Sequence, residues 1–174
     1  MSSVVISGDT SGAITLSAPA VSGTNTATLP AATGTVMVSG NMPAFSAYYA
    51  GAGQSISANT WTKITFNTEE YDTNNNFASN RFTPTVAGYY QVNTGFRMSN
   101  NATQSVLSVW KNGAEYKRCT DLGVNNIQTL FGASLVYCNG STDYIEIYVY
   151  IGSSQTGDNG SNTVWYNGSM VRGA

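Results

Sequence analysis

The segment DYIEIYVYIG, residues 143–152, constrains the fold more than any other part of the chain. Side chains in a β-strand alternate between its two faces. One face of this segment carries only β-branched aliphatic residues: Ile145, Ile147, Val149 and Ile151. The other face carries Tyr144, Glu146, Tyr148 and Tyr150. The aliphatic face predicts a strand that packs into a sandwich core, and the tyrosine face is too apolar for the open surface of an isolated domain.

The tyrosine face predicts a contact surface. Tyrosine is favoured at interfaces because it combines a large contact area with a hydroxyl that can stay hydrated. We expect a second subunit to cover this face, although a loop or the N-terminal segment of the same chain is an alternative. The predicted subunit-interface residues are Tyr144, Tyr148, Tyr150 and Tyr166.

The remainder of the chain after residue 42 reads as all-β. In residues 89–98, Tyr90, Val92, Phe96 and Met98 alternate with Tyr89, Gln91, Asn93 and Arg97, which predicts that the first set faces the core. Asn112-Gly113 between two β-prone runs is a strong hairpin signal. Further strands are predicted at 61–66, 105–110, 130–137, 144–151 and 163–171. Many short strands without helical periodicity indicate a sandwich, jelly roll or barrel.

Residues 1–42 differ in composition from residues 43–174. They contain almost no charge and no aromatic residue, and Gly, Ser, Asn and Pro separate short β-prone pieces. The predicted pieces are Val4–Ile6, Ala13–Leu16, Thr26–Leu29 and Thr35–Val38. Pieces this short cannot bury enough apolar surface to be stable alone. We therefore predict that residues 1–42 are an attachment segment that becomes ordered through contact with its partners. A disordered leader is the alternative.

The low charge excludes several classes of function. Charged residues make up 9% of the chain and the net charge is -2, so no basic surface is available for nucleic acid. No apolar run has transmembrane length, and we see no signal peptide. The two cysteines, Cys119 and Cys138, are too few for a disulfide scaffold, and we interpret them as free thiols while leaving a pairing open.

Catalytic chemistry is not predicted. The chain has no histidine, and the adjacent Glu69 and Glu70 would point apart in an extended segment. The segment 156–162 offers one carboxylate, too few for calcium within one subunit, although a shared site between subunits stays open. We therefore expect no enzyme, no metal within one subunit and no cofactor.

Several aromatic residues could stack on a glycan, although each could equally belong to the core or an interface. They are Trp61, Trp110, Trp165, Tyr116 and Tyr166. Trp110 lies on the strand face opposite Leu107 and Val109, at the start of the Asn-Gly hairpin. Trp110 and Tyr116 are accordingly the predicted ligand-contact residues.

A set of spaced aromatic and glycine residues carries a family resemblance. It begins with PAFSA at 43–47 and ends with YNGSMV at 166–171, and its key positions are Phe45, Phe66, Asp72, Phe77, Phe82, Gly88, Tyr90, Tyr166 and Gly168. The pattern resembles the globular head domain of the first complement component, a tumour-necrosis-factor-like jelly roll. Phe82 follows Phe77 after four residues instead of six, and Val92 and Thr94 replace aromatic residues. The resemblance implies a head at 43–174 that forms a homotrimer, with its first and last strands near the three-fold axis.

A second resemblance involves three segments: SGDTSGAITL, GTNTATLPAATGTV and FTPTVAGYYQV. They look like segments of tailed-bacteriophage virion proteins, including tail fibres that present such heads. This resemblance implies a virion protein made in the host cytoplasm and released by lysis, which agrees with the absence of a signal peptide.

These features lead to one function hypothesis with two alternatives. We expect a tail-fibre or receptor-binding appendage, attached to other virion proteins through residues 1–42, whose trimeric head contacts a host-surface glycan or protein. A trimeric capsid decoration protein that stabilises the shell is the first alternative. A soluble glycan-binding module is the second.

Overall fold

The computed structural model describes residues 3–21, 23–28, 31, 33–34, 36–123 and 126–174. The chain forms two compact units, Met1–Gly34 and Thr35–Ala174. Met37, which lies within the segment 1–42, packs against the core of the larger unit. No helix in the described ranges is long and apolar enough to span a bilayer.

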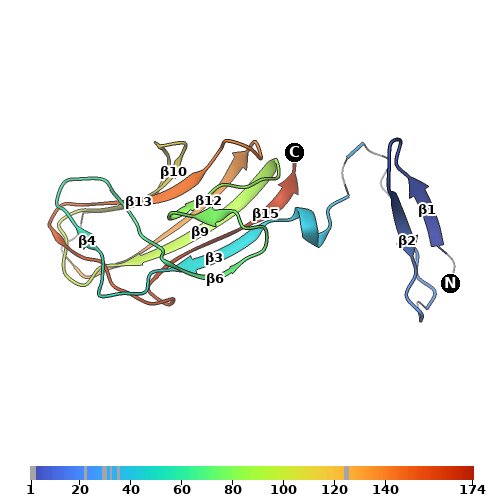
Figure 1. Ribbon diagram of the computed structural model, residues 1–174. Helices are drawn as coiled ribbons and strands as arrows, with labels where there is room; N and C mark the ends of the chain where they lie inside the picture. The colour runs from blue at the N-terminus through green and yellow to red at the C-terminus, as the bar shows by residue number, and fades with distance from the viewer. Residues whose placement is uncertain (1–2, 22, 29–30, 32, 35, 124–125) are drawn as a thin grey trace. The chain divides into compact units, whose positions relative to one another are not determined.

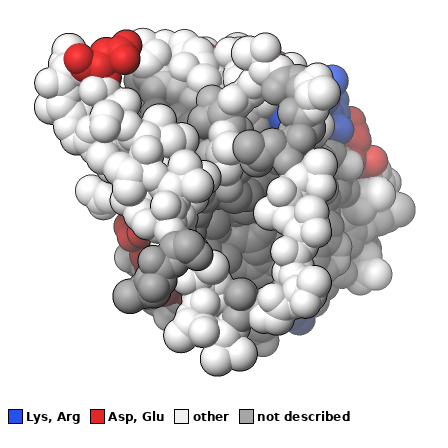
Figure 2. Space-filling view, turned by 90° about the vertical axis from the view of Figure 1, so that its right-hand side faces the viewer, with Lys and Arg blue, Asp and Glu red and all other residues white. Residues whose placement is uncertain are grey.

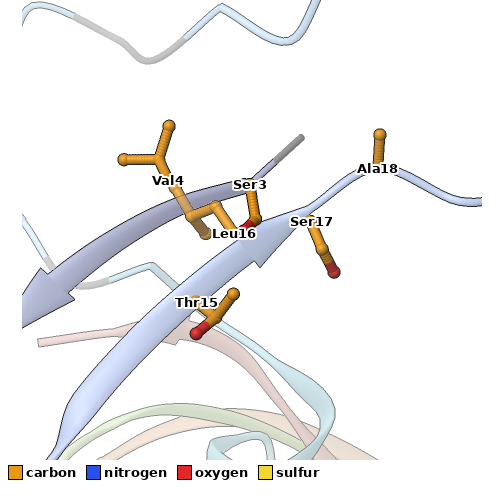
Figure 3. Close-up of a pocket in the computed structure, with 6 residues that line it drawn as sticks. All are labelled: Ser3, Val4, Thr15, Leu16, Ser17 and Ala18. Carbon is orange, nitrogen blue, oxygen red and sulfur yellow. The ribbon is translucent and has the colours of Figure 1, made fainter. Parts of the chain in front are cut away.

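The N-terminal unit is a β-hairpin (Figure 1). Strands β1 (Ser3–Ser7) and β2 (Ala13–Ser17) pair antiparallel, and all of their residues are exposed. Val4 pairs with Leu16 and Ile6 pairs with Ile14, so one face of the hairpin is apolar. Figure 3 shows Val4 and Leu16 next to each other on the two strands. A two-stranded hairpin has marginal stability by itself, and the apolar side chains on this face are exposed.

The other two predicted N-terminal strands are wrong where the structure describes them. Residues 26–28 and 36–38 are not in strands, whereas Leu29 and Thr35 lie outside the described residues. Instead, Ser39–Asn41 forms a 3-10 turn in which the Asn41 side chain accepts a hydrogen bond from the Val38 backbone N–H at 2.7 Å. Short β-prone runs form strands only where a neighbouring strand pairs with them.

Two antiparallel sheets face each other in the larger unit (Figure 1). The first sheet has the order β12 (Thr129–Cys138), β9 (Gly88–Arg97), β15 (Val164–Gly173), β3 (Ala44–Tyr48) and β6 (Thr68–Asp72). The second has the order β11 (Ala114–Leu122), β10 (Ser105–Lys111), β13 (Ile145–Ile151), β8 (Arg81–Phe82) and β7 (Phe77–Ala78), with β5 (Thr62–Lys63) also pairing with β13. A small sheet joins β4 (Ser55–Ile56) to β14 (Gln155–Thr156). The all-β prediction is confirmed.

The core between the two sheets contains the residues that strand alternation predicted. The fully buried inward residues of β13 are Ile145, Ile147, Val149 and Ile151, and those of β9 include Tyr90, Val92 and Phe96. Phe45 lies at the centre of an aromatic group, with its ring 4.3 Å from that of Phe82 and 4.8 Å from that of Tyr166. Because these rings come from both sheets, their packing joins the two layers.

Backbone geometry explains two of the glycines, Gly88 and Gly113. At Gly88 a Cβ atom would lie 2.4 Å from the carbonyl oxygen of Arg172, so the β9–β15 ladder leaves no room for a side chain there. At the β10–β11 turn Asn112 has a φ of 54° and Gly113 a φ of 79°. Two positive φ values are what a type I′ turn requires, and the predicted hairpin is confirmed.

The strand predicted at 61–66 is shortened to Thr62–Lys63.

We predict opposite effects for the hydroxyls of two buried tyrosines. The Tyr90 hydroxyl donates to the Val86 carbonyl at 2.6 Å, so Tyr90→Phe should lower the free energy of unfolding by about 1–2 kcal/mol. Among the described residues the Tyr166 hydroxyl has no hydrogen-bond partner, so Tyr166→Phe should be neutral or stabilising by up to ~1 kcal/mol. Denaturant unfolding of both variants measures the difference, and equal losses would contradict this account.

Candidate assembly and ligand surfaces

The tyrosine face of β13 is covered partly by the same chain. Trp61, which precedes β5, lies 5.6 Å from the ring of Trp110 and 5.6 Å from the ring of Tyr150. Trp110 in turn stacks on Tyr148 with ring centroids 4.1 Å apart. Tyr148 and Tyr150 are therefore half-buried, because a loop provides the cover that we expected mainly from a second subunit.

A buried carboxylate anchors one end of this aromatic layer. The side chain of Glu146 is only 3% exposed, and it binds Lys63 at 2.8 Å and Arg81 at 2.7 Å. Burial disfavours its charged form, but hydrogen bonds from the two cations outweigh this effect, so the pKa of Glu146 lies below its ordinary value. The guanidinium of Arg81 also lies 3.7 Å above the ring of Tyr144. The predicted interface residue Tyr144 is thus half-buried beneath an arginine.

A second charged group lies at the other end of the layer. Arg118 on β11 donates to both oxygens of Glu115 and to Asp121. The hydrogen bond from Arg118 is the main reason why the pKa of Glu115 is lowered, and Ser108 donates to the same carboxylate. The Arg118 guanidinium lies 5.8 Å from the ring of Trp61, so these ion pairs hold it beside the aromatic residues.

These residues border a hollow of about 170 Å³ on the outward face of the second sheet. Its walls are formed by Trp61, Gln104, Val106, Arg118 and Tyr150. The hollow combines aromatic rings with an arginine and an amide. The sequence indicates Trp61 as a glycan-stacking candidate and Tyr150 as an interface residue, but it does not indicate Gln104, Val106 or Arg118 as site residues. The signal that was missing is the loop packing that brings Trp61 and Gln104 to the same place.

The outward face of the first sheet exposes an apolar cluster along β12 and β9. Phe131 is 60% exposed and Leu135 is 51% exposed, and Tyr137 pairs across the strands with Tyr89. The rings of the two tyrosines lie 5.4 Å apart. We call Tyr89, Phe131, Leu135 and Tyr137 the β12 apolar face.

The centre of the same sheet face carries an indole ring and polar side chains. A Cβ atom at Gly95 would lie 2.5 Å from the indole nitrogen of Trp165, so this glycine allows the indole to lie across β9. Asn93 lies directly opposite Asn167 and donates to it at 3.2 Å. Strands β3 and β15, the first and last of the head, pair at the middle of this sheet.

The structure corrects one predicted interface residue. Tyr166 is 0% exposed and lies among core aromatic residues, so the interface prediction for it is wrong. The physical reason is the alternation of β15, which turns Tyr166 inward together with Val164 and Gly168. Of the two predicted ligand-contact residues, Trp110 is half-buried in the stack and Tyr116 is 41% exposed.

Neither cysteine forms a disulfide. Cys138 is buried, and burial raises the pKa of its thiol to about 12, whereas Cys119 is half-buried on β11. In the described ranges, no three His, Cys, Asp or Glu side chains are grouped so that they could hold a metal ion. Asp158, the carboxylate of the segment 156–162, pairs with Arg97 at 2.5 Å.

Solved structures of two related kinds match this geometry. The globular domain of the zebrafish complement 1qA protein matches with a TM-score of 0.58 at 17% identity, over 76% of this chain and 98% of that domain. Murine APRIL matches with a TM-score of 0.60 at 8% identity, over 75% of this chain and 99% of its own. Eiger TNF from S. frugiperda matches with a TM-score of 0.52 at 10% identity, over 77% of this chain and 95% of its own.

The chain has the jelly-roll fold of complement heads and TNF-type domains. This confirms the predicted fold class, and at such low identity the likeness establishes the fold alone. No protein-family model matches the sequence. No curated protein matches it either.

We predict that Glu146→Gln lowers the free energy of unfolding by about 3 kcal/mol at neutral pH, because the two cations lose their buried carboxylate. The lowered pKa of Glu146 stabilises the fold fully above the unfolded-state pKa, near 4.5, and this contribution is lost as the pH falls through the lower folded-state pKa. The stability of the variant should therefore fall less steeply below pH 4.5.

Urea unfolding at a series of pH values measures both effects. Asp121→Asn is the matched control, because its ion pair with Arg118 is solvent-exposed and its loss should leave the free energy of unfolding nearly unchanged. An unchanged acid slope in Glu146→Gln would contradict the assignment.

Proposed function

We propose that this protein is a bacteriophage virion structural protein that acts as a tail-fibre or receptor-binding appendage. The N-terminal unit attaches the chain to other virion proteins. The jelly-roll head assembles as a homotrimer and is displayed outward, where it contacts the host surface.

The observation that carries this proposal is the presence of two exposed apolar surfaces with different positions in the chain. The hairpin exposes Val4, Ile6, Ile14 and Leu16 by 55–67%. The head exposes the β12 apolar face on its first sheet. Surfaces of this kind on a soluble protein are typical of interaction sites, so one supports attachment and the other supports self-association.

The surface composition supports a role in display and binding over a role in catalysis. Charged residues are 9% of the chain, and Figure 2 shows one side of the molecule on which most of the surface carries neither sign of charge. Most of the carboxylates of the head are held by neighbouring cations or amides, as with Glu146, Asp143 and Asp158. Such carboxylates are positioned to stabilise loops and strands.

The first sheet supports a specific arrangement of the trimer. The family resemblance implies that the first and last strands lie near the three-fold axis, and β3 and β15 lie side by side in the middle of this sheet. The Asn93–Asn167 region and the β12 apolar face then contact neighbouring subunits. In this arrangement the β12 apolar face replaces the β13 tyrosines as the main self-association surface.

We predict that Leu135→Glu converts the head trimer to monomers. Leu135 is 51% exposed in the single chain, so the charge is tolerated by the fold, but burial at each subunit contact costs about 3–5 kcal/mol without a partner. Native mass spectrometry of the full chain measures the oligomeric state.

Tyr116→Glu is the matched control for this experiment, because Tyr116 is similarly exposed but lies on β11 of the second sheet. It should remain trimeric. A stable monomer of the unaltered chain, or a trimer of Leu135→Glu, would contradict the assembly proposed here.

The function itself is tested by locating the protein on the particle. Antibody-gold electron microscopy should label the tail tip or fibres of virions, and antibody against the head should reduce adsorption to host cells. Label spread evenly over the capsid would support the decoration protein instead. Absence of label from purified virions would overturn the proposal.

A further inference from the structure

We infer that the hollow between Trp61, Arg118 and Tyr150 is a binding site for one neutral pyranose unit, such as the end or a branch of a polysaccharide. This inference rests on the proposed function, because it names the ligand class that a displayed head would recognise. The site shares only Trp61 with the glycan-stacking candidates that the sequence suggested, since Trp110 packs against Trp61 without lining the hollow and Tyr116 does not line it either.

The aromatic wall is built before any ligand arrives. Trp61 is held by Trp110, at an interplanar angle of 64°, and by Tyr150, at 55°. Tyr150 is itself fixed, because its hydroxyl and the side-chain oxygen of Asn59 lie 3.1 Å apart in a hydrogen bond. Aromatic faces carry negative partial charge and attract the weakly positive C–H edge of a sugar ring. Because these rings are already packed in place, binding costs little side-chain entropy.

The polar groups at the hollow are suited to sugar hydroxyls. Arg118 donates three hydrogen bonds, two to Glu115 and one to Asp121. A guanidinium has five N–H groups, so, counting the bonds within the described residues, two N–H groups of Arg118 are available to a ligand. Within the described residues, the side-chain amide of Gln104 makes no hydrogen bond and is exposed. An amide both donates and accepts, which matches a hydroxyl pair on a sugar.

Charge and size together select the ligand class. The charge of Arg118 is balanced by two carboxylates, both within 3.0 Å, so the site does not favour an anionic sugar. A hollow of about 170 Å³ is also smaller than the ~300 Å³ typical of drug-sized ligands. These two properties favour one uncharged ring.

The position of the hollow is compatible with assembly. It lies on the outward face of the second sheet, formed by Val106 of β10, Arg118 of β11 and Tyr150 of β13. The β12 apolar face lies on the outward side of the opposite sheet, so self-association there leaves the hollow open to solvent.

The test is saturation-transfer NMR on the full chain with methyl glycosides of glucose, galactose, mannose and N-acetylglucosamine as separate probes. At least one should show saturation with a low-millimolar Kd, as expected for a ligand of this size. Trp61→Ala should abolish the signal, and Gln104→Ala should weaken binding about fivefold, as for the loss of one hydrogen bond. Tyr116→Ala is the control and should bind like the unaltered chain.

Gln104 is exposed, so its variant tests the site even where Trp61→Ala destabilises the head. The inference is overturned by the absence of saturation with every neutral probe, by saturation with N-acetylneuraminic acid alone, or by equal binding of Gln104→Ala. Each of these results is independent of the label on virions. If the protein is located on virions but binds no sugar, only the inference of a sugar site fails. If it binds sugar but is not located on virions, only the virion assignment fails.

Discussion

The packing of Phe45 against rings from both sheets is the interaction on which the rest of the head depends. Phe45 comes from the first sheet and stacks on Phe77 and Phe82 of the second, with centroids 5.1 and 4.3 Å away. Tyr166 meets the same ring edge-on at 4.8 Å. Aromatic pairs in these geometries add to the free energy of simple area burial, and here they join strands that are distant in sequence. With the inner faces occupied in this way, the outer faces are available for function.

The outward faces of the two sheets differ in how far their apolar side chains are covered. The second sheet hides much of its aromatic surface beneath Trp61 and closes the ends with ion pairs around Glu146 and Arg118. The first sheet leaves Phe131 and Leu135 exposed, and at its centre Trp165 lies over Gly95. The proposed ligand hollow lies on the face that Trp61 partly covers, and the proposed self-association surface lies on the face whose apolar side chains stay exposed.

Sequence alternation predicted the core well because a strand has a strict period of two. The inward residues of β9 and β13 were identified correctly, as were the hairpin at Asn112-Gly113 and the positions of the major strands. The interpretation of outward faces was weaker. Alternation says that Tyr148 and Tyr150 leave the core, but it says nothing about Trp61, which reaches them from a different segment. For Tyr166 the same rule should have indicated burial, since Val164 and Met170 share its face.

The sequence by itself determined the all-β class and the two inward faces, because alternation and turn residues are local properties. Only the tertiary structure decided which apolar surfaces remain exposed, because exposure depends on segments that meet from distant parts of the chain. The tyrosines of DYIEIYVYIG are an example. Their facing direction follows from the segment alone, whereas their cover follows from where the loop that carries Trp61 crosses the sheet.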